Sequence, residues 1–114
     1  VVKDEQNSEA SNRLPKIQDT DIDLSKYDEI ILGTPVWWYR PAPAIRTFLN
    51  QNDLSGKTIK PFATNAGWLG KTFKEIRTLC PNSEIYEGMN IVFESYSDKL
   101  VTKEQDIENW IKTL

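Results

Sequence analysis

The chain of 114 residues contains no histidine and a single cysteine, Cys80. An internal disulfide, a zinc site and a proton relay based on histidine are therefore excluded. We predict no catalytic side chain and expect a cofactor to bring any chemistry that takes place. Cys80 stands beside Pro81 with neither a neighbouring base nor a second thiol, so we interpret it as a small buried apolar residue.

A strong charge of either sign is also absent. The 14 basic and 17 acidic residues give a formal net charge of -3 without a lysine or arginine cluster, which argues against nucleic acid and anionic membrane as partners. No apolar run approaches the ~20 residues of a membrane span. Because Val1 is not followed by a signal-peptide pattern either, we expect a soluble, cytoplasmic protein.

Two short polar patterns carry little functional signal. Asp19, Asp21 and Asp23 alternate, but they lack a further ligand spacing such as that of the EF-hand, which favours a solvated stretch over a metal site. The letters "GKT" at residues 70–72 resemble the end of a nucleotide-binding loop, but Asn65 stands where that motif needs glycine. We expect "KT" in the first turn of a helix instead.

Apolar runs alternate along the chain with stripes of helical spacing. Residues 27–33, 58–64 and 84–93 are predicted strands, and the predicted helices are residues 43–51, a second helix that Pro81 ends, and a third that Thr102 caps. This alternation predicts an α/β fold in which helices cover both faces of a parallel sheet. Residues 1–26 are interpreted as an extended polar lead-in with one helical turn near residues 1–6, and residues 27–114 as the domain.

The stretch "TPVWWYRPAP", residues 34–43, combines three aromatic residues with three prolines. Proline fixes φ and removes a donor, so residues 33–41 are predicted to form a loop. The rings of Trp37, Trp38 and Tyr39 would then stack on a planar ligand, or one or two of them would pack into the core or against a subunit.

A second loop, "TNAGWLGKT" at residues 64–72, follows the second predicted strand. Its small residues Ala66, Gly67 and Gly70 would let backbone N–H groups approach a ligand, although an ordinary turn between strand and helix explains them too. Both loops follow a strand and lead into a helix, so they should lie side by side at the carboxyl edge of the sheet, where ligands bind in such folds.

Four separated blocks resemble a known family in their order and spacing: "LSKYDEIILGTPVWWYRPAPAIRTFL", "LSGKTIKPFATNAG", "LCPNSEIYEGMNI" and "EQDIENWIKTL". They resemble the central and C-terminal parts of flavodoxin-like proteins that bind FMN, and more narrowly a bacterial subgroup with a "YPIWW" loop. The resemblance implies a flavodoxin-like parallel sheet with helices on both faces, represented here by three strands and three helices.

The same resemblance assigns both loops to the flavin. The loop that covers the isoalloxazine corresponds to Thr34, Pro35, Val36, Trp37 and Trp38. The loop that lines the other side of the flavin and its pyrimidine edge corresponds to Thr64, Asn65, Ala66 and Gly67. No metal site is implied.

The sequence departs from the family pattern in two ways. The family usually has glycine where Tyr39 stands and a more glycine-rich loop around Asn65 and Trp68, so the pocket is expected to be narrower. The first strand and the phosphate-binding loop of a flavodoxin have no counterpart in the sequence, so FMN should bind weakly or not at all. We expect the chain to be part of a longer flavodoxin, or to cover its exposed apolar strand with residues 1–26 or by forming a homodimer.

The resemblance implies an FMN-binding electron carrier or an FMN-dependent oxidoreductase similar to quinone reductases. Its partners would be a redox partner protein, a nicotinamide or a quinone. The alternative is a non-catalytic interaction module that has lost its cofactor and uses the patch formed by Trp37, Trp38 and Tyr39 as its contact surface.

Overall fold

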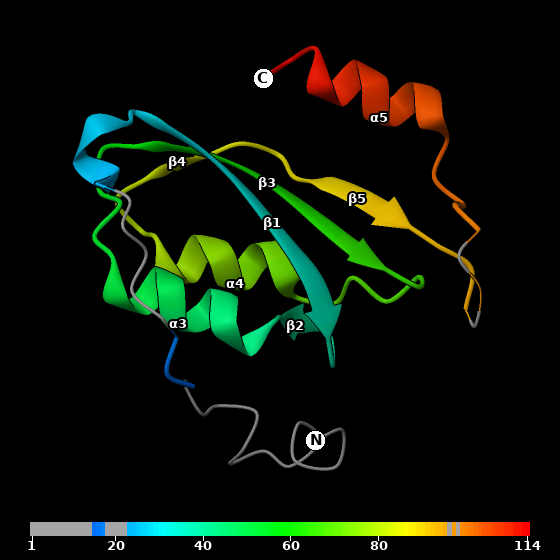
Figure 1. The fold of residues 1–114 in the computed structure, drawn as a ribbon, viewed down its shortest axis with the longest axis horizontal. Coiled ribbons are helices and arrows are strands. Elements are labelled where there is room, and N and C mark those ends of the chain that lie inside the picture. The colour runs from blue at the N-terminus through cyan, green and yellow to red at the C-terminus, as the bar shows by residue number, and fades with distance from the viewer. Residues whose placement is uncertain (1–14, 18–22, 96, 98) are drawn as a thin grey trace.

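The computed structural model describes residues 15–17, 23–95, 97 and 99–114, which form a sheet with helices on both faces (Figure 1). Its strands are β1 (Glu29–Trp37), β2 (Arg40–Pro41), β3 (Thr58–Asn65), β4 (Glu84–Ile85) and β5 (Met89–Val92). Its helices are the 3-10 helix η1 (Leu24–Lys26) and the α-helices α3 (Pro43–Gln51), α4 (Thr72–Leu79) and α5 (Glu104–Ile111). None of the described helices is long and apolar enough to cross a membrane.

The sheet is mainly parallel, as predicted. Its strand order is β2-β1-β3-β4, and β5 also pairs with β3. β3 runs parallel to β1, β4 and β5, whereas β2 pairs with the end of β1 in the antiparallel direction. The expected alternation of strands and helices, and with it the flavodoxin-like α/β fold, is confirmed.

The prediction that residues 33–41 form a loop is wrong, because β1 continues to Trp37 and β2 follows after two residues. Thr58 N–H donates to the Asp28 carbonyl oxygen (2.9 Å), so the backbone groups of even-numbered residues in β1 face β3. Those of odd-numbered residues face outward. Pro35 is therefore tolerated in the strand, because an N–H at this position would point away from β3 and its absence removes no hydrogen bond between the two strands.

The third predicted strand, residues 84–93, is divided into β4 and β5. Gly88 lies between them against the ring of Phe73, where an added Cβ would be 2.4 Å from Cζ of that ring. The chain bends at this close approach and returns to β3 at Met89.

The main core lies between the sheet and the two helices α3 and α4. Its buried side chains are Leu32, Leu49, Leu54, Ile59, Ile76 and Cys80. The prediction that Cys80 is a buried apolar residue is confirmed, and its burial raises the pKa of the thiol. This thiol therefore stays protonated and shielded at neutral pH.

Helix α5 lies on the opposite side of the sheet from α3 and α4 (Figure 1). Trp110 packs edge-on against Phe62 of β3, with ring centroids 5.7 Å apart. The buried Lys60 reaches the same end of the helix, because its Nζ donates to the Thr113 carbonyl oxygen (3.1 Å) and pairs with Glu29 (3.0 Å). A lysine at a helix C-terminus satisfies a carbonyl group that the helix itself leaves free.

The expected N-cap at Thr102 is wrong, because α5 begins at Glu104 with Lys103 in the capping position. The Thr102 hydroxyl instead accepts the Val92 N–H (2.7 Å) and donates to the Asn90 carbonyl oxygen (3.3 Å). The Thr102 side chain, which the local sequence pattern predicts as the cap of the helix, therefore makes its hydrogen bonds with β5.

The lead-in is described only in part. Residues 1–6, Asp19 and Asp21 lie outside the described residues. Residues 24–26, expected to be extended, form η1, and Asp23 caps it by accepting the Ser25 N–H (3.1 Å). The hydrogen bonds from Ser25 to the Asp23 carboxylate lower its pKa. Asp23 therefore acts as a local cap rather than as a metal ligand.

Candidate functional site

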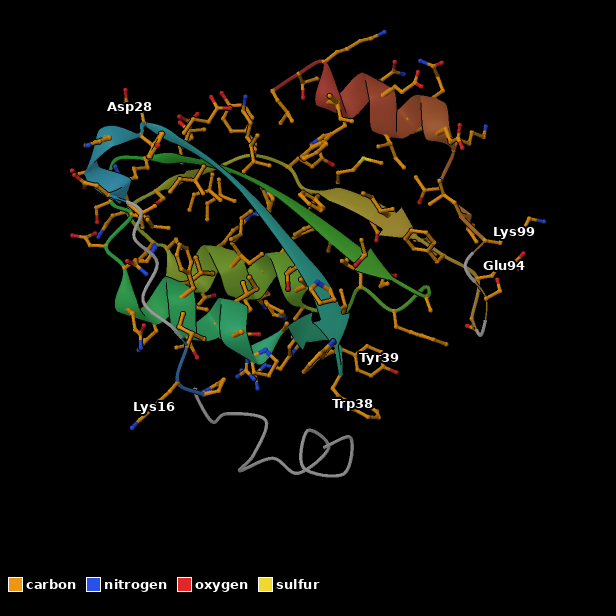
Figure 2. The ribbon with its side chains drawn as sticks, viewed as in Figure 1. Lys16, Asp28, Trp38, Tyr39, Glu94 and Lys99 are labelled. Atoms are coloured by element: carbon orange, nitrogen blue, oxygen red, sulfur yellow. The ribbon has the colours of Figure 1, made fainter. Side chains whose placement is uncertain are left out.

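Trp38 and Tyr39 form the tip of the hairpin between β1 and β2 (Figure 2). Both residues have positive φ, 53° for Trp38 and 65° for Tyr39. A two-residue hairpin turn with positive φ at both positions matches the right-handed twist of its strands, but it usually contains asparagine and glycine. Two aromatic residues in this conformation indicate local backbone strain of the kind found at ligand-binding sites.

The aromatic rings of the hairpin are exposed. Trp37, Trp38 and Tyr39 are 45%, 41% and 54% exposed, and the rings of Trp38 and Tyr39 project from the hairpin tip (Figure 2). The alternative in which one or two of these rings pack into the core is therefore wrong. The hairpin presents a surface of aromatic carbon atoms to solvent.

The aromatic hairpin is attached to the start of α4. Lys71 N–H donates to the Tyr39 carbonyl oxygen (2.9 Å), and a Cβ added at Gly70 would lie 2.3 Å from Cβ of Tyr39. The Arg40 guanidinium pairs with the Glu75 carboxylate in the first turn of α4, with Nε 3.0 Å from Oε2. These contacts confirm that the two loops lie side by side.

The second loop begins where β3 ends at Asn65. The Asn65 side-chain Oδ1 accepts the Gly67 N–H (2.8 Å), and its Nδ2 donates to Oδ1 of Asn90 in β5 (2.5 Å). Gly67 has a φ of 111° and no atom within 4 Å of the position that a Cβ would take. The space beside the Gly67 Cα is therefore open, although its N–H is bonded to Asn65, and the neighbouring Trp68 is 55% exposed.

Some of the predicted site residues are buried and support the hairpin, whereas others are exposed to solvent. Thr34 is 2% exposed, and its hydroxyl donates to the Pro35 carbonyl oxygen (2.8 Å) and accepts the Ala42 N–H (3.0 Å). Through these two bonds Thr34 links the backbone of β1 to the backbone that follows β2. Pro35 is exposed, whereas the partly buried residues are Val36, Thr64, Asn65 and Ala66. Pro35 and Thr64 are paired across β1 and β3, so the two predicted sets do meet at one edge.

Sequence reasoning gave less weight to three residues that now contribute to this edge. Tyr39, one of the three rings expected to stack on a ligand, and Trp68, expected to narrow the pocket, are both exposed at this edge. Their signal was visible as aromatic residues within two loops. Asn90 gave no local signal, because its contact with Asn65 joins residues 25 positions apart in the sequence.

Exposed aromatic rings are the main feature of this edge. The described residues contain no group of three or more histidine, cysteine, aspartate or glutamate side chains that could hold a metal ion. The carboxylate of Glu75 is paired with Arg40 and serves the connection between hairpin and helix. The edge combines exposed aromatic rings with open space beside the Gly67 Cα.

The family model named Flavodoxin matches residues 3–114. The chain belongs to the flavodoxin family. No curated protein is significantly similar to it in sequence. The family assignment therefore comes from a pattern that extends over nearly the whole chain, in agreement with the four blocks noted above.

Solved flavoproteins have the same fold. A protein of Bacteroides uniformis described as a flavoprotein is 25% identical with a TM-score of 0.73, covering 97% of this chain and 72% of its own. A similar protein of Bacteroides eggerthii is 25% identical with a TM-score of 0.70, covering 98% and 71%. The flavoprotein of Lactobacillus acidophilus, solved in complex with FMN, is 23% identical with a TM-score of 0.65, covering 96% and 65%.

Proposed function

We propose that this flavodoxin-family chain binds the ring system of FMN at the edge formed by its aromatic hairpin and its second loop, and serves electron transfer or an oxidoreductase reaction. The observation that supports this most directly is the attachment of the exposed aromatic hairpin to the second loop through Tyr39 and Lys71. Membership in the flavodoxin family and the FMN complex of a structural neighbour agree with it.

The residues present fit a flavin ring. The indoles of Trp37 and Trp38 offer faces on which a planar ring can stack, which is worth about 0.5–1.5 kcal/mol per pair beyond area burial. The absence of a side chain at Gly67 leaves room for the pyrimidine edge to come close to the second loop. When bound, FMN would supply the redox chemistry, while this chain would position the ring and set its surroundings.

The described residues offer little for the phosphate of FMN. Helix α3, which follows the aromatic hairpin, begins with Pro43, which has no N–H, and the N–H of Ala42 is bound to Thr34. At α4, the N–H groups of Lys71 and Thr72 are bound to carbonyl oxygens of Tyr39 and Leu69. We therefore propose that the chain holds FMN weakly, mainly through its ring.

Titration of the 114-residue chain with FMN and with riboflavin, followed by quenching of tryptophan fluorescence, tests this proposal. We expect similar, weak affinities for the two flavins, since riboflavin has the same ring without the phosphate. Trp38→Ala should weaken both about two- to tenfold through the loss of stacking. Tyr27→Ala removes an exposed ring at the other end of β1 and should change neither affinity.

Two outcomes would contradict the proposal. Absence of quenching by FMN at millimolar concentration, and by riboflavin close to saturation, would show that the edge is not a flavin site. An affinity for FMN far above that for riboflavin would show that the chain binds the phosphate group.

The electron donor or acceptor would be a redox protein, a nicotinamide or a quinone in the cytoplasm. The proposal also places the chain in the bacterial subgroup with a "YPIWW" loop.

The exposure of Trp37, Trp38 and Tyr39 also supports a second candidate function, that of an interaction module without a cofactor. Two results together would favour that second function. The protein would stay colourless with excess FMN, and Trp38→Ala would abolish its binding to another protein.

A further inference from the structure

We propose that Asn90 is a positioning residue for the second loop: it orients the amide of Asn65, which in turn fixes the backbone at Gly67. The inference deepens the proposed function, because it assigns the order of the flavin-facing loop to a side chain on another strand. It also makes a claim about loop order that holds whether or not a flavin binds.

The hydrogen bonds determine which way the Asn65 amide points. Its Oδ1 must accept the Gly67 N–H, at 2.8 Å, because an amide nitrogen could not accept that proton. Its Nδ2 is then directed at Oδ1 of Asn90, at 2.5 Å. A partner that accepts a hydrogen bond at position 90 therefore stabilises the one orientation of Asn65 that holds Gly67.

The strand pairing places Asn90 where it can do this. Asn90 pairs with Ala63 in the ladder between β3 and β5, and Asn65 lies two residues further along β3, so the two side chains are diagonal neighbours on one face. The backbone at Asn90 is tied down as well, since its carbonyl oxygen accepts the hydroxyl of Thr102 at 3.3 Å. Asn90 is thus anchored to β3 and to the segment before α5.

The segment that Asn90 orders needs such support. Gly67 has a φ of 111° and no side chain, and the adjacent Trp68 is exposed, so few contacts limit their conformations. A ligand that requires this loop in one conformation binds more weakly when the free loop samples many. Loss of the Asn90 acceptor should therefore lower flavin affinity without direct contact between Asn90 and the flavin.

Three variants separate positioning from general stability. Asn90→Leu removes the acceptor while keeping a similar volume, and Asn90→Asp keeps an acceptor for Asn65 Nδ2. Asn109→Leu is the matched control, because Oδ1 of Asn109 accepts a comparable exposed bond from Gln105 Nε2 (2.9 Å) within α5. The Asn90 side chain is exposed, so its replacement should leave the fold intact.

The experiment combines amide hydrogen exchange at Gly67, riboflavin titration and the thermal midpoint for the whole chain. For Asn90→Leu we expect exchange at Gly67 to accelerate and riboflavin affinity to fall, each about two- to tenfold, the range for loss of one hydrogen bond. Asn90→Asp should restore both values. Asn109→Leu should change neither, and the thermal midpoint should stay within about 4 °C in all three variants, as expected for surface substitutions.

Unchanged exchange at Gly67 in Asn90→Leu would overturn the proposal, and so would equal effects of Asn90→Leu and Asn109→Leu. If riboflavin fails to bind even the unsubstituted chain, the proposed function fails. The exchange rate at Gly67 then still decides the role of Asn90.

Discussion

At the scale of single residues, the hairpin tip has aromatic residues at positions where the backbone favours asparagine or glycine. Trp38 and Tyr39 both have positive φ, a conformation in which a side chain crowds the backbone and which asparagine and glycine adopt more easily. Contacts to α4 hold the turn in place, through the Tyr39 carbonyl oxygen and through the pairing of Arg40 with Glu75. Strain that is retained in exposed aromatic residues fits a function for their rings.

Tyr39→Asn should therefore stabilise the protein. Asparagine tolerates positive φ, and the Tyr39 ring is largely exposed, so we expect the free energy of unfolding to rise by about 0.5–1 kcal/mol. Urea denaturation measures the change. Tyr27→Asn is the control, because Tyr27 is equally exposed but has a φ of -120°, and no gain is expected there. A gain at both positions would mean that relief of strain is not the cause.

At the scale of elements, the site depends on how closely the hairpin approaches the start of α4. Gly70 permits this approach, because a Cβ there would collide with Cβ and the carbonyl oxygen of Tyr39. Gly33 serves β1 in a related way, since the ring of Phe62 lies over its Cα. Neither requirement is visible in the local sequence, because each partner comes from a different strand or loop.

Gly70→Ala should cost more stability than Gly56→Ala. Both glycines have positive φ, 57° and 79°, but only the Cβ at position 70 meets other atoms within 4 Å. We expect about 1 kcal/mol for Gly56→Ala from backbone conformation, and a further 1–3 kcal/mol for Gly70→Ala from the collision. Urea denaturation again gives both values. Equal losses would show that the hairpin moves away from α4 without resistance.

At the scale of the whole molecule, the described residues leave one long edge of the sheet open. β2 pairs with the outer side of β1 only at Val36 and Trp37. Between residues 29 and 35 the outward backbone groups of Glu29, Ile31 and Gly33 have no strand beside them, and Ile31 is half exposed. Such an edge is a template for pairing with another strand.

We expect a second copy of the chain to pair along this edge. An antiparallel register with Ile31 opposite Ile31 sets Glu29 opposite Gly33, so no like charges face each other and the outward N–H and carbonyl groups match. Sedimentation should then show dimers that Ile31→Lys disrupts, while Asn50→Lys, an exposed site on α3, leaves them intact. A monomer at all concentrations would mean that the edge stays open or that another segment covers it.

Prediction from sequence succeeded where a local pattern reports directly on structure. The apolar run of β1, the helical spacing of α3 and the stop at Pro81 placed these elements, because burial of apolar side chains repeats with the period of each element. The meeting of the two loops also followed, since the carboxyl ends of parallel strands share one edge of a sheet.

The sequence by itself determined the fold class, the family and the two segments that meet in the candidate site, because these depend on patterns within short segments and on their order. Only the tertiary structure decided that β1 runs on through Pro35, that Thr102 bonds β5 instead of capping α5, and that Asn90 reaches Asn65. The physical reason is that hydrogen-bond partners and close approaches between distant segments depend on strand register, which no single stretch of sequence contains.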